Sequence, residues 1–344
     1  EEWKKYRFET FQGIILKGKR VSVDTAFCPE IVKYLQKGRY DIVVLTVLAS
    51  PTALLAVHTL RRRKIPYYYE GDGGFAKEAS GIKATLKRYL ISAAGKCFSS
   101  SNEFDRYCIT YGAKPENLIR YPFTSVKKAD CLTERLPDAE KQRRKQEFGI
   151  TESCAVISVG QFIPRKGMDL LLECCKDLPE HVGVYIVGGT PPTEYLEICE
   201  KYRLQNVHFL DFMPKDRLMR LMTAMDLFAL FTREDIWGLV INEAMAAGLP
   251  VISTDRCIAA LELIPGRGTC ENGKEDADAG MIVENENLGQ MKEALLTLIQ
   301  SPELREKLSE NAICRIQSYT IETMAAEHDR IFQKLSAERR ERRN

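Results

Sequence analysis

The sequence has no uninterrupted apolar run of about 18 residues, which is the length that a membrane-spanning helix requires. No signal peptide is visible at its start, where residues 1–5 are strongly charged. The chain also has no initiator Met, so we expect it to begin inside a longer natural sequence. The first of these absences excludes a transmembrane helix.

Paired metal and disulfide motifs are missing as well. The 11 cysteines are scattered without a Cys-x-x-Cys pair, and several of them, such as Cys154, Cys174 and Cys175, lie in apolar runs. The four histidines show no metal-binding spacing. We therefore expect a reducing compartment, free thiols and no metal site.

The glycine motifs of three large enzyme classes are absent. No Gly-x-Gly-x-x-Gly follows a predicted strand, which counts against a dinucleotide-dependent dehydrogenase. The sequence also has no Gly-x-Ser-x-Gly and no Gly-Lys-Ser/Thr loop. The nucleophile elbow of an α/β-hydrolase and the phosphate loop of a P-loop NTPase are therefore both missing.

What is present is a soluble globular composition with an uneven charge distribution. The 344 residues are 44% hydrophobic and 28% charged, and their number suggests two domains. The net charge of +2 conceals an asymmetry, because residues 1–150 hold 28 Lys and Arg against 17 Asp and Glu, whereas residues 151–344 hold 22 against 31. A basic half and an acidic half predict two domains that face different partners, with an ordinary solvated surface as the alternative.

Apolar strand-like runs alternate with helical patterns in both halves. In the first half we expect strands over 40–45, 65–69, 96–99 and 118–121, helices over 52–63 and 102–111, and a basic amphipathic helix that carries Lys83, Lys87 and Arg88. In the second half we expect strands over 155–159, 184–189, 207–210, 227–231, 251–253 and 281–283, and helices over 167–175, 194–202, 215–222 and 239–247. Such alternation is typical of parallel sheets covered on both faces, so the predicted fold class is α/β with two doubly wound units.

The pattern divides the chain into four parts. Residues 1–123 are predicted to form the first α/β domain, 124–150 a charged connection with one exposed helix, and 151–318 the second α/β domain. Three further helices close the chain, the last over about 321–335. Residues 319–344 are expected to form a C-terminal helix and basic tail that pack back toward the first domain.

Three loops that follow strands are candidate sites, because ligands of open parallel sheets bind beyond the carboxyl ends of the strands. The first loop, residues 160–167, places Arg165 and Lys166 at the start of a helix. Two cations beside the unpaired N–H groups of a helix N-terminus favour an anion such as a phosphate or diphosphate. A solvated loop with incidental basic residues is the alternative.

The second loop, residues 232–244, joins Glu234 and Asp235 to a glycine at a helix start, Gly238. Glu243 follows inside an apolar helix, where a carboxylate is costly to bury without a partner. A carboxylate at that position can accept two hydrogen bonds from a ribose. Helix capping explains Glu234 and Asp235 equally well, but it does not explain Glu243.

The third loop, residues 71–74, offers the carboxylate of Asp72 among glycines. Glycine permits a close approach of the backbone to a ligand. A plain tight turn explains these residues equally well.

These segments together resemble a known family. Residues 158–167, residues 235–243 and the run Ala244-Met245-Ala246-Ala247-Gly248-Leu249-Pro250-Val251 are similar to glycosyltransferase family 4, the retaining transferases of the GT-B fold. The resemblance covers nearly the whole chain and is strongest over residues 155–285. It implies two Rossmann-like domains that face a cleft, with a nucleotide-sugar donor in the C-terminal domain and the acceptor on the N-terminal domain.

The resemblance also implies roles for individual residues. Lys166 would grip the donor diphosphate, and Glu243 would hold the ribose hydroxyls. The remaining donor contacts would be the backbone of Gly238, Leu239 and Val240 at the distal phosphate and the sugar, Gly160 at the donor, and Phe212 in the segment 211–213 that meets the base.

The sequence departs from the family pattern at three positions. The first Glu of the usual pair is Asp235, preceded by a second carboxylate, so a shorter side chain would bond a donor-sugar hydroxyl. The usual basic residue after the glycine is Gln161, which leaves the diphosphate to Lys166 with help from Arg165. Where many members carry a histidine in the acceptor cleft, Asp72 would contact the reacting sugar or the acceptor.

The family's usual opening strand and glycine-rich loop are not recognisable in this sequence. We therefore expect the N-terminal domain to be truncated and to lack its first strand. The sequence therefore predicts only part of the acceptor-binding side.

The resemblance implies transfer of a sugar from a nucleoside-diphosphate sugar, with UDP favoured, to a glycan or lipid-linked acceptor in cell-envelope polysaccharide synthesis. The reaction would retain the anomeric configuration and need no metal or cofactor. Asp276-Ala277-Asp278 matches the Asp-x-Asp pattern of metal-dependent sugar transferases, but we expect only a polar loop there. The alternatives are a GT-B nucleotide-sugar epimerase and a catalytically silent nucleotide-binding partner of a glycan-synthesis complex.

The basic half predicts a location as well as a partner. Residues 61–64 and the helix with Lys83, Lys87 and Arg88 would present cations that suit an anionic lipid surface or a phosphate-bearing acceptor. We expect a cytoplasmic protein, peripheral on the inner face of the membrane, that binds no nucleic acid.

Overall fold

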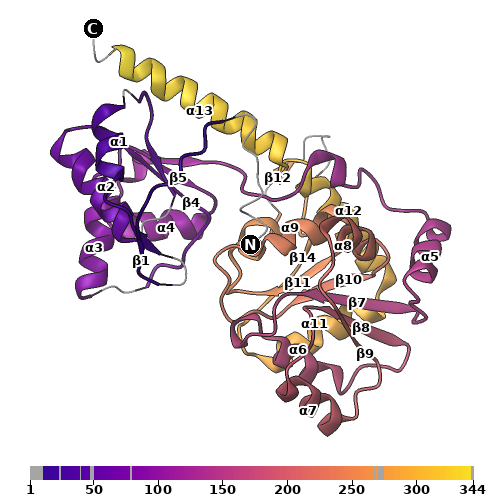
Figure 1. The fold of residues 1–344 in the computed structure, drawn as a ribbon. Coiled ribbons are helices and arrows are strands. Elements are labelled where there is room, and N and C mark those ends of the chain that lie inside the picture. Colours follow the sequence, from indigo (N-terminus) through magenta and orange to yellow (C-terminus); the bar gives the residue numbers. More distant parts are fainter. Residues whose placement is uncertain are drawn as a thin grey trace.

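The computed structural model describes residues 11–22, 25–38, 40–46, 50–77, 80–266, 268–269 and 275–341. These residues form two α/β bodies, and a long C-terminal helix runs from the second body back along the first (Figure 1). Each body contains a parallel sheet, which confirms the predicted α/β class.

The sheet of the first body has four described strands in the order β3-β4-β5-β6, and all of them are parallel. The strands are β3 (Val44–Leu45), β4 (Tyr68–Gly71), β5 (Cys97–Ser99) and β6 (Leu118–Arg120). The helices are α1 (Ile31–Lys37), α2 (Pro51–Arg62), α3 (Ile82–Ile91) and α4 (Asn102–Thr110). Because sequential parallel strands are joined by right-handed crossovers, α2, α3 and α4 lie on one face of this sheet.

The opposite face of the first sheet is covered by the C-terminal helix α13 (Ile321–Glu341). Side chains alternate between the two faces of a strand. Tyr67 and Tyr69 accordingly pack in the core beneath the connecting helices, whereas Tyr68 packs with Phe98 against Leu335 of α13. The last helix of the chain therefore completes the first body.

The sheet of the second body has six strands in the order β14-β11-β10-β7-β8-β9. The strands are β7 (Cys154–Val159), β8 (Val182–Val187), β9 (Val207–Leu210), β10 (Leu227–Leu230), β11 (Val251–Thr254) and β14 (Gly280–Val283). The helices are α5 (Asp138–Glu147), α6 (Met168–Cys175), α7 (Thr193–Tyr202), α8 (Lys215–Met222), α9 (Leu239–Ala246), α10 (Ile258–Leu263), α11 (Leu288–Gln300) and α12 (Pro302–Ile316). The strand order reverses between β7 and β10, and this switch point is the usual place for a ligand in such a sheet.

Short elements complete the architecture. Two two-stranded antiparallel ribbons are formed by β1 (Lys19–Arg20) with β2 (Ala26–Phe27) and by β12 (Gly268–Thr269) with β13 (Glu275–Asp276). Turns of 3₁₀-helix occur at Pro115–Asn117, Lys128–Asp130 and Pro164–Lys166.

Several predicted elements differ from the structure. The strand expected over 65–69 is paired only over Tyr68–Gly71, because Lys64 adopts a left-handed backbone (φ 55°) and Pro66 has no N–H for a sheet. The helix α10 was not expected, since its apolar run is buried on nearly every side and shows no polar face. The expectation of free thiols throughout is wrong for Cys314, which is disulfide-bonded.

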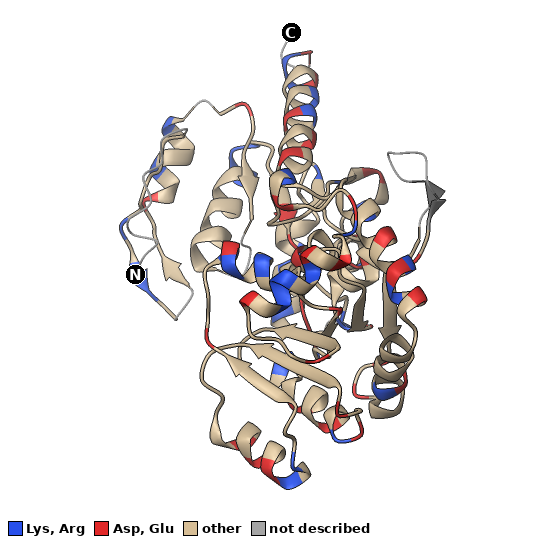
Figure 2. Ribbon diagram, turned by 90° about the vertical axis from the view of Figure 1, so that its right-hand side faces the viewer, with Lys and Arg blue, Asp and Glu red and all other residues tan. Residues whose placement is uncertain are grey.

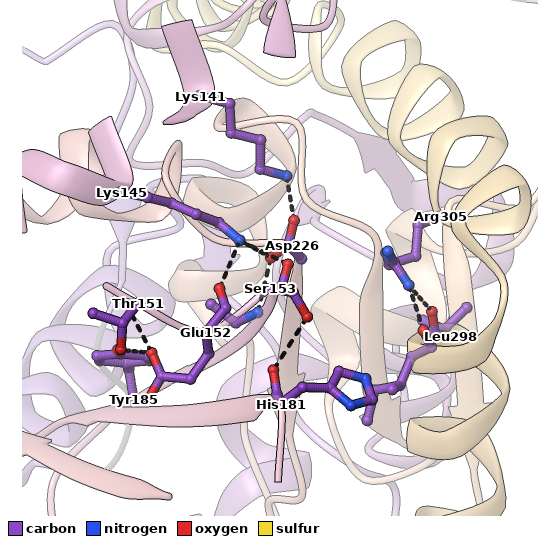
Figure 3. A network of polar contacts seen from close by, with 12 residues as sticks. Lys141, Lys145, Thr151, Glu152, Ser153, His181, Tyr185, Asp226, Leu298 and Arg305 are labelled. Carbon is purple, nitrogen blue, oxygen red and sulfur yellow. Dashed lines mark hydrogen bonds and ion pairs between the residues drawn. The ribbon is translucent and has the colours of Figure 1, made fainter. Parts of the chain in front are cut away.

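The helix α5, expected to be exposed, buries one charged side chain in the second body (Figure 3). Lys145 is only 3% exposed, and its Nζ lies 2.7 Å from Oδ2 of Asp226, just before β10. The Nζ of Lys141 lies 2.7 Å from the other carboxylate oxygen. Burial alone would raise the pKa of Asp226, but these two ammonium groups hold it below its ordinary value. The network attaches α5 to the amino end of the second sheet.

The helix α13 has 21 residues and carries charges of both signs along its length (Figure 2). Among the helices that the structure describes, none is both long enough and apolar enough to cross a membrane.

A buried carboxylate joins the two bodies. Glu262 of α10 is 4% exposed, and its Oε2 accepts a hydrogen bond of 3.4 Å from the backbone N–H of Asn102, the first residue of α4. Nη1 of Arg120, at the end of β6, lies 3.5 Å from the same oxygen, and the hydroxyl of Tyr319 donates to Oε1 at 3.3 Å. One side chain of the second body therefore caps a helix of the first.

A histidine fixes α13 to the first sheet. Nδ1 of His328 lies 2.8 Å from the carbonyl oxygen of Met324, and Nε2 lies 3.0 Å from Oε1 of Glu70 in β4. Both partners are acceptors, so both ring nitrogens must donate, which requires the protonated imidazole. The hydrogen bond to Glu70 raises the pKa of His328 above its ordinary value, although burial acts in the opposite direction.

The attachment of α13 should therefore depend on pH. Because the pKa is raised in the folded protein, its contribution to stability is present below the unfolded value of about 6.5 and is lost as the pH rises through the folded value. We expect His328→Gln to lower the free energy of unfolding by about 1–2 kcal/mol at pH 6, where a hydrogen bond to a charged group is lost, and by less at pH 9. Thermal unfolding at the two pH values measures this, and an equal loss at both would contradict the assignment.

Candidate active site

A cleft of about 640 Å³ lies between the two bodies at the carboxyl ends of their strands. All twelve residues singled out from the sequence line it: Asp72, Gly160, Gln161, Arg165, Lys166, Phe212, Glu234, Asp235, Gly238, Leu239, Val240 and Glu243. Four further residues complete the lining: Phe123, Val159, Ile236 and Trp237. The sequence motifs thus converge in one place at the switch point of the second sheet.

The loop from β7 to α6 presents the two cations of the cleft. A turn of 3₁₀-helix over Pro164–Lys166 ends at Gly167, which has a left-handed backbone (φ 64°). A Cβ at Gly167 would lie 1.8 Å from the carbonyl oxygen of Phe231, so only glycine fits there. This close packing sets Arg165 and Lys166 against the loop that follows β10.

The loop after β10 is hydrogen-bonded to the cation loop. The carbonyl oxygen of Arg165 accepts from the Thr232 hydroxyl and from the Arg233 backbone N–H, both at 2.8 Å. Arg233 also holds both carboxylate oxygens of Asp169 in α6, at 2.9 and 2.6 Å. Planar paired contacts of this kind fix geometry strongly, so the two loops act as one unit.

Asp235 joins the two cations. Its Oδ2 lies 2.5 Å from Nζ of Lys166, and its Oδ1 lies 3.3 Å from Nη1 of Arg165. The same guanidinium nitrogen donates to the carbonyl oxygen of Glu234 at 2.9 Å. The Glu234 side chain points elsewhere, since its Oε2 lies 2.8 Å from Nζ of Lys77 in the first body.

The helix α9 begins in the cleft without a side-chain cap. Its N-cap is Gly238 (φ 99°), and a Cβ there would lie 2.6 Å from Sγ of Cys257. The first N–H groups of an α-helix have no partner within the helix, so the backbone of Leu239 and Val240 offers donors to an anion. Because Gly238 has no side chain, the backbone at the start of α9 stays open to a ligand.

Glu243 lies one turn further along α9. Burial raises its pKa, while Lys215 and a hydrogen bond from the Ser125 hydroxyl to Oε1, at 3.2 Å, act against that rise. The carboxylate thus has a partner from the connection between the bodies, and it still lines the cleft.

Phe212 gives the lining of the cleft an exposed aromatic ring. Phe212 is 67% exposed, and its ring lies 2.9 Å from the position of a Cβ on Gly189. Gln161 is exposed beside Gly160 at the start of the cation loop. Gly160, Gln161 and Phe212 thus add a glycine backbone, an uncharged polar side chain and an aromatic ring to the lining.

The first body contributes the loop after β4. Asp72 is exposed to the cleft, and its carbonyl oxygen accepts from the Ser100 hydroxyl at 2.9 Å. A Cβ on Gly73 would lie 1.8 Å from the carbonyl oxygen of Ile236, so the two bodies meet in direct backbone contact here. Asp72 therefore lines the same cleft as the two cations.

Two aromatic residues complete this part of the site: Trp237 lies in the second candidate loop of the sequence, whereas Phe123 was missed. Trp237 is 3% exposed, and its Nε1–H donates to Oδ1 of Asn242 at 2.8 Å. Phe123 packs edge-to-face on the Trp237 ring at 5.3 Å, and its carbonyl oxygen accepts from Nδ2 of Asn242 at 3.3 Å. The sequence placed Phe123 only at the end of a domain, and no motif marks its contact across 114 residues.

No group of three or more His, Cys, Asp or Glu side chains is arranged to hold a metal ion in the described ranges. In the Asp-x-Asp segment, the carboxylate of Asp278 accepts from the backbone N–H of Gly266 at 2.9 Å. The expectation of a plain polar loop is wrong for Asp276, which ends β13.

Comparisons with known proteins agree with this geometry. The glycosyl transferases group 1 family matches residues 139–315, which is just over half of the chain. D-inositol 3-phosphate glycosyltransferase of Corynebacterium glutamicum is 25% identical over 288 residues, which cover 80% of this chain and 65% of that protein. Lipopolysaccharide glucosyltransferase WaaG of Escherichia coli is 30% identical over 187 residues, which cover 52% of this chain and 46% of that protein. The chain thus matches between about half and two thirds of the length of these relatives.

Solved structures show the fold. HepE of Anabaena in complex with UDP superimposes with a TM-score of 0.70 at 19% identity, over 90% of this chain and 82% of that one. The predicted GT-B arrangement of two Rossmann-like domains is therefore confirmed. With the family match over residues 139–315, the chain belongs to the glycosyl transferases group 1 family.

Proposed function

We propose that this protein transfers a sugar from a nucleoside-diphosphate sugar, with a UDP-sugar favoured, to a hydroxyl of a glycan or lipid-linked acceptor in cell-envelope polysaccharide synthesis. One observation carries the proposal: a single cleft joins two cations, an uncapped helix start and the carboxylate of Glu243. These groups match the diphosphate and the ribose of such a donor. The relatives named above are a glycosyltransferase and a glucosyltransferase, and the structural neighbour binds UDP.

The proposed chemistry retains the anomeric configuration and uses no metal. The bond between the anomeric carbon and the diphosphate oxygen breaks while the acceptor oxygen bonds the same face of that carbon. The acceptor proton passes to the departing diphosphate. Lys166, Arg165 and the start of α9 would stabilise the negative charge that develops on the leaving group. Asp72, which lines the cleft from the first body, would contact the reacting sugar or the acceptor.

Nucleotide binding is the first test of this proposal. Trp237 lines the cleft, and Trp3 is the only other tryptophan of the sequence. In a Trp3→Phe variant, we expect UDP to change the fluorescence of Trp237 with a saturable titration curve, and GDP and ADP to act more weakly. A flat response to all three nucleotides would contradict a donor site in the cleft.

Removal of the main cation should impair catalysis. We expect Lys166→Ala to lower kcat by about 10²–10³-fold, the usual loss when one preorganised donor to a developing anion is removed. Lys292→Ala is the control, because it deletes the same charge at an exposed ion pair with Asp177 outside the cleft. The measurement is sugar transfer by the full-length protein. A decrease in kcat of less than threefold for Lys166→Ala would refute the role of Lys166 at the leaving group.

The two alternative functions have different products. A nucleotide-sugar epimerase would convert the free donor when no acceptor is present, whereas a silent nucleotide-binding partner would bind UDP without any turnover. The short carboxylate of Asp235 and the uncharged Gln161 are the features that favour the silent partner. A product analysis with and without acceptor therefore separates all three functions.

We also propose that the first body contacts an anionic lipid surface on the cytoplasmic face of the membrane. Ile82 of α3 is 89% exposed and Leu86 is 37% exposed, beside the exposed cations Lys83 and Arg88. Lys87 is not part of this surface, because its ammonium lies over the rings of two tyrosines at 4.9 and 4.7 Å. An exposed apolar edge flanked by cations suits a lipid interface.

Vesicle binding tests this contact. We expect sedimentation with phosphatidylglycerol vesicles at low ionic strength, with less binding as salt screens the cations. A Lys83→Glu, Arg88→Glu double variant should bind more weakly, and vesicles of phosphatidylcholine alone should not bind. Absence of binding to anionic vesicles at low salt would reject the proposal.

A further inference from the structure

We propose that Asp235 serves as an internal anion: paired with Lys166 and Arg165, its carboxylate occupies the place of the donor diphosphate, and it thereby disfavours the free nucleoside diphosphate relative to the complete nucleotide sugar. This inference rests on the proposed function, because it assigns the cleft to a nucleotide sugar. It gives Asp235 a part in choosing between substrate and product.

The position of the carboxylate carries the first step. Asp235 neutralises both cations of the cleft at once, with oxygens 2.5 Å from Nζ of Lys166 and 3.3 Å from Nη1 of Arg165. Its Oδ2 also lies 3.7 Å from the place of a Cβ on Gly238, where α9 begins. Two cations and a helix start are the partners that a diphosphate requires, and a carboxylate already lies among them.

The surrounding contacts fix the backbone of Asp235. Its N–H donates to the carbonyl oxygen of Arg256 at 2.7 Å, and its own carbonyl oxygen accepts from the N–H of Ile258 at 3.3 Å. If the Asp235 carboxylate changes partners, its side chain rotates while its backbone stays in place. Glu234 does not take this place, because its carboxylate is paired with Lys77.

The exchange has different costs for the two ligands. A diphosphate that takes Lys166 must break its 2.5 Å ion pair and leave the carboxylate, whose side chain is only 10% exposed, beside new negative charge. Hydroxyls of a donor sugar can then donate to the released carboxylate and offset that loss. A free nucleoside diphosphate has no such hydroxyls at that end, so it bears the full cost.

The experiment compares the affinity for UDP of the wild-type chain and of Asp235→Asn, through the fluorescence of Trp237 in the Trp3→Phe background. We expect about 10-fold tighter binding of UDP by the variant, because the diphosphate no longer competes with the Asp235 carboxylate for the ammonium of Lys166. Asp235→Ser, which removes the carboxylate with a different side-chain volume, should change the affinity in the same direction. Circular dichroism establishes that each variant is folded.

Two controls isolate the mechanism. Glu286→Gln deletes one exposed carboxylate of the same domain that is paired with Arg233, outside the cleft, and should leave the affinity for UDP unchanged. In a Lys166→Met background, Asp235→Asn should give a gain of less than threefold, because the pair that it releases is already absent. A full gain without Lys166 would overturn the inference.

The sugar arm tests the selectivity. The affinity for the UDP-sugar that the wild-type protein uses is measured without acceptor. Asp235→Asn should bind this UDP-sugar no more tightly than wild type does. The ratio of the affinity for the UDP-sugar to that for UDP therefore falls about 10-fold in the variant. Equal or weaker binding of UDP by folded Asp235→Asn and Asp235→Ser, or an equal gain for both ligands, would overturn the inference while the proposed function stands. Failure of the wild-type chain to bind UDP, GDP or ADP would instead overturn the proposed function, and this inference with it.

Discussion

The hydrogen bonds that Thr232 and Arg233 donate to the carbonyl oxygen of Arg165, both at 2.8 Å, are the contact on which the site depends. They join the loops of β7 and β10, the two strands between which the order of the sheet reverses. At this point the loops turn to opposite faces, and a crevice opens between them. The bond across that crevice sets the cations against Asp235 and keeps the start of α9 beside them, so the charges face one another before any ligand arrives.

The second constraint lies between the two bodies. The cleft needs residues from both, and their relative position is held by contacts of different strength. Glu262 is 4% exposed and caps α4 across the boundary, whereas the ion pair of Lys77 with Glu234 is largely exposed and therefore weak. Trp237 and Asn242 hold the connection through Phe123. The buried contacts therefore hold the two bodies together more firmly than the exposed ion pair beside the cleft does.

The sequence predicted the loops of this site because their residues lie in short motifs after strands. Lys166 and Gly238 lie at helix starts, and Glu243 is an unexplained carboxylate in an apolar helix, so each is legible without tertiary contacts. Phe123 was not legible, because its role depends on an aromatic ring 114 residues away. The sequence led us to expect the last helix near the first domain, but not which residues meet it: Tyr68 faces α13, whereas its neighbours Tyr67 and Tyr69 face the other side. Local sequence patterns predict loops and the alternation of helices and strands, whereas contacts between distant segments depend on the final packing.

Glu243 links the cleft to the connection between the two bodies. A carboxylate in an apolar helix needs a donor, and the Ser125 hydroxyl supplies one from the connection between the bodies. The ammonium of Lys215 donates to the carbonyl oxygen of the same serine, so the connection is itself held to α8. Under the proposed function, a ribose that takes this carboxylate must share it with Ser125 or displace the serine. Since burial raises the pKa of Glu243, its carboxylate stays ionised more readily with a hydroxyl donor in that place, whether from Ser125 or from a ribose. Under that function, the donor ribose and the connection between the two bodies would therefore use the same carboxylate.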